Sequence, residues 1–254
     1  ADLSNAILTG ADLSGMDLTG TKLRDVDLSG KDLTGTILTG ANLTGATLDG
    51  VDLSGKDLTW TILTDVNLEN TILTDANMNC IGNSVCSIMD LNNTVLSGRD
   101  LTNVNLDGID LKGRDLSDAI LKYTDLSNKD LTGTILKGAD LTGANLDGVD
   151  LKGRDLMGTI LKDIDLSNKN LTGTILQGAD LTNVTLPNIS LSGTNFQKTV
   201  FDGVNLSGKS LSGSSLWYTS FQNADMTNTV LRSADLMKSN LTGANLSGSD
   251  LSYT

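Results

Sequence analysis

Leucine recurs at every fifth position over almost the whole chain. The frame runs through 16 consecutive positions from Leu3 to Met78, and it resumes for 33 positions from Leu91 to Leu251. Leu occupies 44 of these 49 positions. The exceptions are Met78, Phe196, Phe201, Phe221 and Met226. A period of five fits neither an α-helix nor a β-strand, so the pattern predicts a repeat architecture that grows along one axis.

Each Leu is the centre of a five-residue unit with a regular polar pattern. Taking Leu as position i, i−2 holds Ala, Val, Thr or Lys, and i−1 holds Asp, Asn or Ile. Position i+1 holds Ser, Thr or Lys, and i+2 holds Gly, Asn or Asp. We expect i and i−2 to point inward and i−1 and i+1 to face water, because neighbouring side chains of an extended segment alternate in direction. Gly at i+2 indicates a tight corner with positive φ.

Clear copies of the unit stand at 11–15 (Ala-Asp-Leu-Ser-Gly) and at 139–143 (Ala-Asp-Leu-Thr-Gly). In these residues the chain resembles the pentapeptide-repeat family, whose motif is A(D/N)LXX. The resemblance implies an all-β fold, a right-handed quadrilateral parallel β-helix in which four pentapeptides form each coil. We therefore predict one solenoid domain over 1–254, with about 12 coils and one interrupting loop. Its first repeat block is 1–78 and its second is 91–254.

A longer period is superimposed on the pentapeptides. Residues 113–152 and 153–192 match at 25 of 40 positions, so the duplicated unit is two coils. Within this unit, position i−1 holds Asp in one coil and Ile in the next. This alternation avoids stacking like charges. Basic residues at i−2 follow the same spacing, and we expect their stems to lie along the corner with the charge in water, or alternatively to pair with Asp. They are Arg114, Lys129, Arg154, Lys169 and Lys209.

The frame slips between Met78 and Leu91, where 13 residues stand in place of 10. We expect three extra residues to bulge from an insertion loop at 79–90. Cys80 and Cys86 either form a disulfide, which would indicate an oxidising compartment, or Cys86 fills a core position as a free thiol. Zinc is disfavoured because the chain has no His. The loop is either a recognition element or a tolerated insertion. Its candidate partner contacts are Ile81 and Asn83.

The last third of the chain differs in character. Phe appears at central positions, Asp thins out after Asp180, and Trp217 and Tyr218 are expected to face outward. These two aromatic residues are candidate partner contacts, although scattered exposed aromatic residues are also common. The open ends of a β-helix are unpaired edges, so we expect further repeats, a missing terminal segment or end-to-end association to cover them. The start at Ala1, without Met, suggests a processed or trimmed chain.

Composition narrows the functions. The net charge is −13 and the pI is about 4.2, which argues against direct binding to nucleic-acid phosphates. No apolar run approaches the length of a membrane span. The chain lacks His, and its Gly residues recur with the repeat and form no phosphate loop, so we predict no catalytic residue, cofactor or metal.

Three functions stay open. The first is a non-enzymatic scaffold, which binds protein partners through its faces, loop and ends within a larger assembly. The second is implied by the resemblance: an acidic DNA mimic acting on DNA gyrase or topoisomerase, although Leu here stands where those relatives favour Phe. The third is a cation- or mineral-associated surface protein, which rests on the Asp columns alone. The resemblance also suggests a thylakoid-like organelle lumen or a secreted setting.

Overall fold

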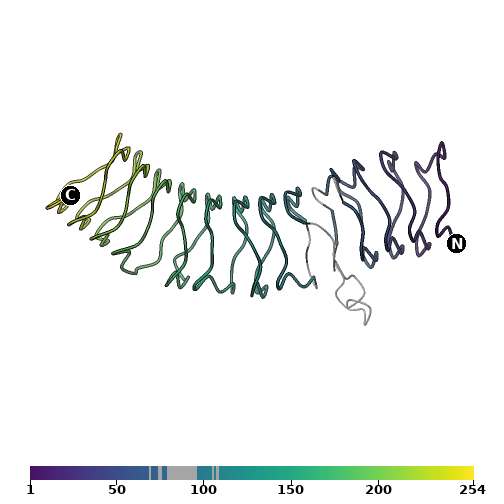
Figure 1. The fold of residues 1–254 in the computed structure, drawn as a ribbon, viewed down its shortest axis with the longest axis horizontal. Helices are drawn as coiled ribbons and strands as arrows, with labels where there is room; N and C mark the ends of the chain where they lie inside the picture. The colour runs from purple at the N-terminus through teal and green to yellow at the C-terminus, as the bar shows by residue number, and fades with distance from the viewer. Residues whose placement is uncertain (69, 74–75, 79–95, 105, 107–108) are drawn as a thin grey trace. The chain divides into compact units, whose positions relative to one another are not determined.

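In the computed structural model, the described residues are all except 69, 74–75, 79–95, 105 and 107–108. They form two compact units, Ala1–Thr134 and Ile135–Thr254. Each unit is a stack of coils (Figure 1). The unit boundary does not coincide with the frame slip, and the single domain over 1–254 stays a prediction. The predicted loop residues Cys80, Ile81, Asn83 and Cys86 lie outside the described part of the chain.

The coil length follows from the β-bridges, which are all parallel. In the first unit Asp2 bridges to Lys22 and Lys22 to Asn42, so each step spans 20 residues, or four pentapeptides. The second unit repeats this spacing from Asp140 to Ile160 and from Ile160 to Asp180, which confirms the predicted alternation of acidic and aliphatic side chains at i−1. Across the described residues the structure contains neither helices nor multi-residue strands, because a turn recurs every five residues and leaves at most one bridging residue per side.

Up to three backbone hydrogen bonds per pentapeptide join successive coils. The Leu3 amide donates to the carbonyl of Lys22 (2.8 Å), and the Lys22 amide donates to the carbonyl of Ala1 (3.0 Å). At the corner, the Asn5 amide donates to the carbonyl of Arg24 (2.8 Å). The same bonds recur in both units, so many polar backbone groups of the straight segments and of the turns are paired along the stacking direction.

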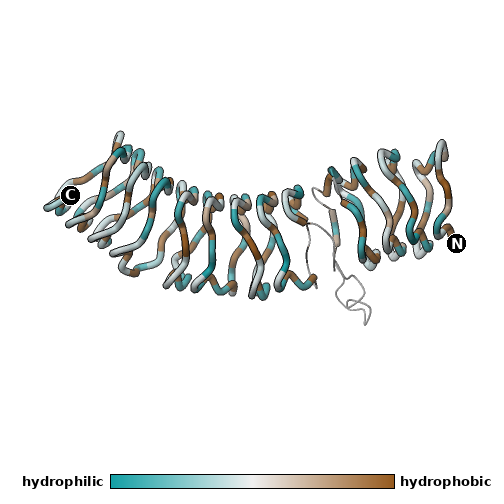
Figure 2. The backbone as a smooth tube through the Cα atoms, viewed as in Figure 1, coloured by the Kyte–Doolittle hydropathy of each residue, from teal (hydrophilic) through white to brown (hydrophobic). Residues whose placement is uncertain are grey.

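The core of each unit is a column of Leu side chains closed by small residues at i−2. Hydropathy accordingly alternates along every coil (Figure 2). Burial stabilises the fold by about 1.5 to 3 kcal/mol per large apolar side chain. In the second unit Phe196, Phe201 and Phe221 are fully buried. The Phe201 ring lies 5.1 Å from that of Phe196 and 5.5 Å from that of Phe221, so the core stays closed where Phe replaces Leu.

Polar residues at i−2 hydrogen-bond to the backbone inside the corner. The Thr36 hydroxyl donates to the carbonyl of Leu13 (2.7 Å), 23 residues earlier. Lys31 uses its Nζ in the same way, donating to the carbonyl of Leu8 (2.6 Å). The Nζ atoms of Lys129, Lys169 and Lys209 also donate to carbonyls of the preceding coil. These Lys side chains are half-exposed, and their ammonium groups bind backbone carbonyls, a partner that neither expectation, water or Asp, included.

One bridge departs from the 20-residue register. Ile72 bridges to Asp100, a step of 28 residues, whereas an insertion of three residues would give 23. The prediction of three extra residues does not fit this bridge, which spans eight residues more than the regular step of 20. Both registers align i−1 with i−1, so the five-residue frame alone cannot choose between them.

In the described part of the chain, no helix has the length and apolarity needed to cross a bilayer.

Candidate partner-binding surface

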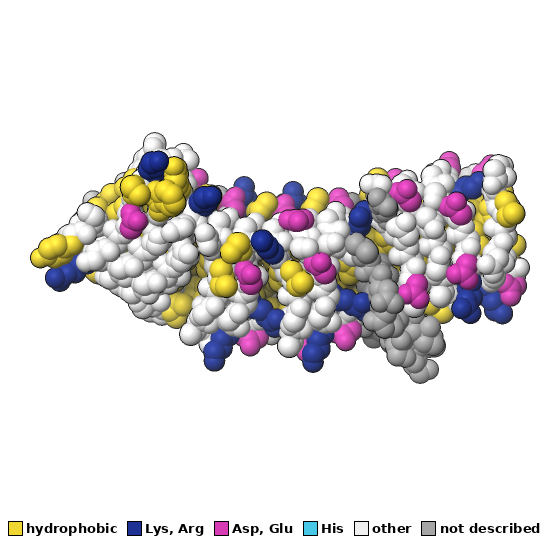
Figure 3. All heavy atoms as spheres, viewed as in Figure 1, with side chains coloured by type: hydrophobic (Ala, Val, Ile, Leu, Met, Phe, Trp, Pro, Cys, Tyr) yellow, Lys and Arg dark blue, Asp and Glu magenta, His cyan; other side chains and the backbone are white. Residues whose placement is uncertain are grey.

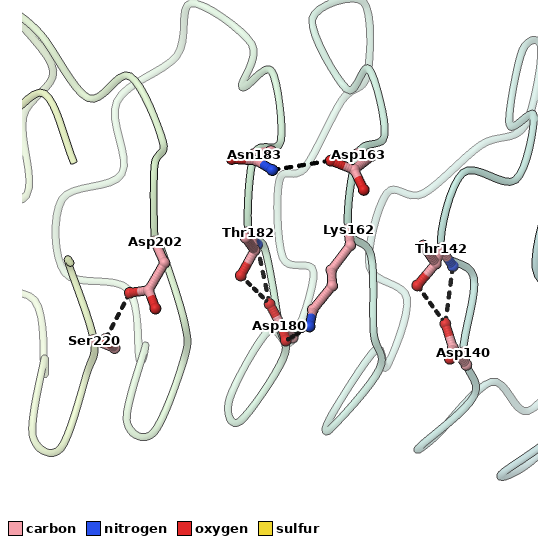
Figure 4. Close-up of polar contacts among 9 residues, drawn as sticks. All are labelled: Asp140, Thr142, Lys162, Asp163, Asp180, Thr182, Asn183, Asp202 and Ser220. Atoms are coloured by element: carbon pink, nitrogen blue, oxygen red, sulfur yellow. Dashed lines mark hydrogen bonds and ion pairs between the residues drawn. The ribbon is translucent and has the colours of Figure 1, made fainter. Parts of the chain in front are cut away.

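The side chains of one face of the second unit form a polar network (Figure 4). Asp140 accepts hydrogen bonds from the amide (3.0 Å) and the hydroxyl (2.6 Å) of Thr142, two residues later. Asp180 is held in the same way by Thr182 and also pairs with Lys162, whose Nζ lies 3.1 Å from Oδ2. The hydrogen bond to Asp180, followed by its negative charge, raises the pKa of Lys162.

Contacts between coils complete this polar face. The Asn183 amide group donates to Asp163 (3.0 Å). Ser220 stands where other coils have Asp, and Asp202 of the preceding coil replaces the missing acceptor by binding the Ser220 hydroxyl (2.6 Å) and the Gln222 amide (2.9 Å). These carboxylates therefore serve the fold itself, which favours a structural role for this face.

Carboxylates at i−1 behave alike elsewhere in both units. In a subset of them the pKa is lowered, chiefly by the hydroxyl of the Ser or Thr two residues later and then by its amide. Such groups include Asp2, Asp12, Asp17, Asp27, Asp32, Asp52, Asp115, Asp130, Asp225 and Asp250. Within the described residues no three potential metal ligands of the His, Cys, Asp or Glu types gather at one point.

A different surface lies at one corner of the last coils. Positions i+1 and i+2 of successive coils place Lys198, Trp217, Tyr218, Met237 and Lys238 together, and we call these residues the aromatic corner. The backbone joins them directly, because the Lys198 amide donates to the carbonyl of Trp217 (2.9 Å) and the Tyr218 amide to that of Met237 (3.1 Å). The register of the coils thus brings residues 20 positions apart into contact.

The aromatic corner presents apolar surface beside positive charge. The rings of Trp217 and Tyr218 lie 4.7 Å apart with a tilt of 51°. Lys238 Nζ lies 5.0 Å from the centroid of the Tyr218 ring and donates to its hydroxyl (2.9 Å). Tyr218 is 45% exposed, Met237 is 55% exposed and Trp217 is half-buried. Hydrophobic side chains accordingly gather on a corner of the C-terminal coils, with basic side chains next to them (Figure 3).

Two features of this corner are costly for the fold. Lys198, Tyr218 and Lys238 occupy the turn position with φ values of 60°, 58° and 59°. A residue other than Gly, Asn or Asp in this left-handed region costs about 1 to 2 kcal/mol, and such strain is concentrated at functional sites. In addition, Trp217 Nε1 is buried and has no acceptor among the described residues, which is unusual for a buried donor.

Sequence reasoning found part of this surface. It singled out Trp217 and Tyr218, and the structure places them side by side, with Tyr218 exposed as expected and Trp217 more covered than expected. It missed Lys198, Met237 and Lys238. The signal that could have found them is the 20-residue spacing, which aligns 198 with 218 and 238.

Comparisons with known proteins agree with the repeat pattern. A family model described as Pentapeptide repeats matches the chain in eight copies. The matched residues are 1–25, 17–55, 56–80, 115–153, 155–188, 188–217 and 218–252. No curated protein matches the chain significantly.

Several solved structures are similar to this chain. HetL, a pentapeptide repeat protein involved in heterocyst differentiation regulation from the cyanobacterium Nostoc sp. strain PCC 7120, is 21% identical, with 96% of this chain and 91% of HetL covered and a TM-score of 0.27. Full-length QnrB1, a plasmid-mediated fluoroquinolone resistance protein, is 16% identical, with 92% of each chain covered and a TM-score of 0.27. Rfr23 from the cyanobacterium Cyanothece 51142 is 25% identical, with 59% of this chain and 90% of Rfr23 covered and a TM-score of 0.17.

Proposed function

Because the chain belongs to the pentapeptide-repeat family, we propose that it is a non-enzymatic scaffold that binds a protein partner through the aromatic corner. The observation that carries this proposal is the column of Lys198, Tyr218 and Lys238, three large side chains in left-handed turn positions of successive coils. Gly, Asn or Asp fill most equivalent positions at lower cost. A surface kept despite this cost, with exposed aromatic and Met side chains, has the composition of a protein interface.

The polar face supports the same assignment by contrast. Its carboxylates accept hydrogen bonds from neighbouring Ser, Thr and Lys side chains, so a ligand would have to displace bonds that hold the turns. This also weighs against a cation- or mineral-associated role for the Asp columns. At the aromatic corner, Lys198 Nζ has neither a hydrogen bond nor an ion pair with any described residue and is available to a partner.

The proposal is tested with a photo-crosslinking amino acid placed at position 218 and, as a matched control, at position 123. Tyr123 occupies the same turn position with φ of 57° and is 61% exposed. In the source cells we expect a discrete protein adduct from position 218 that the Trp217→Ala variant loses, and no such adduct from position 123. Equal crosslinking from both positions, or none from 218, would refute a partner site at this corner.

A second candidate function is an acidic DNA mimic acting on DNA gyrase or topoisomerase. The specific observation in its favour is the distribution of charge: residues 1–180 contain 27 acidic and 14 basic side chains, so they hold the whole net charge of −13. Dense negative charge on a regular scaffold is what such a mimic requires. A supercoiling assay with added protein tests this, and unchanged gyrase activity at saturating protein would exclude it.

We also infer the finer details of the fold from the family: right-handed coils of quadrilateral section, about 12 in number over the chain. The 20-residue register of the bridges supports four sides per coil. A crystal structure would test the handedness and the number of coils directly.

A further inference from the structure

We propose that the aromatic corner binds an extended segment of its partner in which two carboxylates flank one apolar side chain, in the alternating order acidic, apolar, acidic. This inference rests on the proposed scaffold function and specifies the chemistry of the partner. The flanking carboxylates pair with Lys198 and Lys238, and the central apolar side chain packs against Trp217, Tyr218 and Met237.

Charge is the first argument for an acidic partner. Residues 181–254 contain four acidic and four basic side chains, in contrast to the strongly acidic remainder of the chain. Two of the four basic residues, Lys198 and Lys238, belong to the aromatic corner. The neighbouring carboxylate of Asp235 accepts a hydrogen bond from the Met237 amide (3.0 Å) and so belongs to its own turn. The corner therefore offers two ammonium groups beside exposed apolar surface.

Spacing is the second argument. Successive coils are about 4.8 Å apart, so the backbones at Lys198 and Lys238, two coils apart, are separated by about 10 Å. Side chains on one face of an extended peptide recur about every 6.6 Å, and three of them span about 13 Å. The flexible four-carbon stems of the two Lys residues cover the difference. The central side chain of such a triplet then lies over the coil of Trp217 and Tyr218.

Hydrogen-bonding capacity is the third argument. Lys198 Nζ has no partner among the described residues, and Lys238 Nζ is bonded to the neutral hydroxyl of Tyr218. A carboxylate is a stronger acceptor for an ammonium group than a phenol hydroxyl is.

The experiment uses Trp217 as its own reporter. The chain has two Trp residues, so the Trp60→Phe variant of the full chain leaves Trp217 as the only indole. It is titrated with a synthetic peptide of Gly and Ser that contains the sequence Glu-Ser-Phe-Ser-Glu. We expect a saturable change in Trp217 fluorescence that weakens as salt is raised. Replacing both Glu by Gln in the peptide should weaken binding about tenfold, since two exposed ion pairs are lost.

Matched variants identify the residues involved. The double variant Lys198→Asn, Lys238→Asn removes both charges, so peptide binding should weaken about tenfold. Asn tolerates left-handed turns, so the midpoint of thermal unfolding should be unchanged or slightly raised. Tyr123→Asn changes an equivalent turn elsewhere and should leave binding unchanged. Equal affinity for the Glu and Gln peptides, or binding that survives the double Lys variant, would overturn the proposal.

The outcome is separable from that of the scaffold function. A position-218 adduct together with no response to the acidic peptide would leave the scaffold function standing and refute an acidic partner. Saturable quenching by a neutral oligosaccharide, with none by the acidic peptide, would also refute it and assign the aromatic corner to carbohydrate. Loss of both the adduct and the peptide response would refute both proposals.

Discussion

Replacing Gly243 by Ala should destabilise the second unit more than replacing Gly213 by Ala. Both residues occupy left-handed turn positions, with φ of 72° and 65°, so both variants carry the same backbone strain of about 1 kcal/mol. They differ in the space available. A Cβ at Gly213 meets nothing within 4 Å, whereas a Cβ at Gly243 would lie 2.4 Å from Oδ1 of Asn223 in the preceding coil.

The excess cost follows from this contact. Asn223 must turn away from the new methyl group, and a displaced rotamer or a crowded contact costs about 1 to 3 kcal/mol. We therefore expect a loss of about 1 kcal/mol in the free energy of unfolding for Gly213→Ala and about 2 to 3 kcal/mol for Gly243→Ala. Gly35 shows the alternative arrangement, because it stacks over Gly15 rather than over an amide side chain.

Urea unfolding followed by circular dichroism measures the two losses. A double-mutant cycle then isolates the contact: Asn223→Gly removes the obstructing side chain, so it should cancel the excess destabilisation of Gly243→Ala and leave that of Gly213→Ala unchanged. Equal losses for the two single variants, or an excess that Asn223→Gly does not cancel, would show that the contact with Asn223 in the preceding coil is not the cause of the extra destabilisation of Gly243→Ala.

Two further predictions concern the corners and the Asp columns. Lys31→Met should destabilise the first unit by about 1 to 3 kcal/mol, because the carbonyl of Leu8 loses its donor. Lys31→Thr should cost less, since Thr36 makes the equivalent bond to the carbonyl of Leu13. Urea unfolding compares the two variants, and equal losses of stability would contradict this explanation. Stability should fall as the pH drops below about 4, because Asp12, Asp17 and Asp225 have lower pKa values in the folded state than in the unfolded state. Their contribution to stability is complete above the unfolded-state pKa and is lost as the pH falls through the folded-state pKa. Asp17→Asn keeps an acceptor for the Thr19 amide but does not titrate, so this variant should show a weaker pH dependence in acid unfolding curves. An unchanged curve would argue against a contribution of the Asp17 carboxylate to the pH dependence.

The fold could be predicted from sequence to an unusual extent because one rule repeats. Leu at i and a small residue at i−2 predict the buried positions, and Gly, Asn or Asp at i+2 predicts the left-handed turns. The i−2 Lys residues were the exception. Sequence offered water or Asp as partners for their charges, whereas the structure pairs Lys31 with backbone carbonyls. Those carbonyls are present in every repeat, so they leave no signature in the sequence.

The candidate surface was predicted only in part. The adjacent pair of Trp217 and Tyr218 is visible in the chain, but the contribution of Lys198 and Lys238 depends on contacts between coils. The strain of Tyr218 could be foreseen, because i+2 is the left-handed turn position of the repeat, and its φ of 58° agrees with this.

By itself, the sequence determined the repeat unit, the inward and outward positions and the turn residues, because these depend on side-chain properties within five consecutive residues. Only the tertiary structure decided which pentapeptides stack. Ile72 pairs with Asp100 rather than with the residue five positions earlier, although both alternatives present the same repeat position. The five-residue pattern is nearly invariant, so local preferences are equal in every register, and the choice is made by contacts between residues that are distant in the chain.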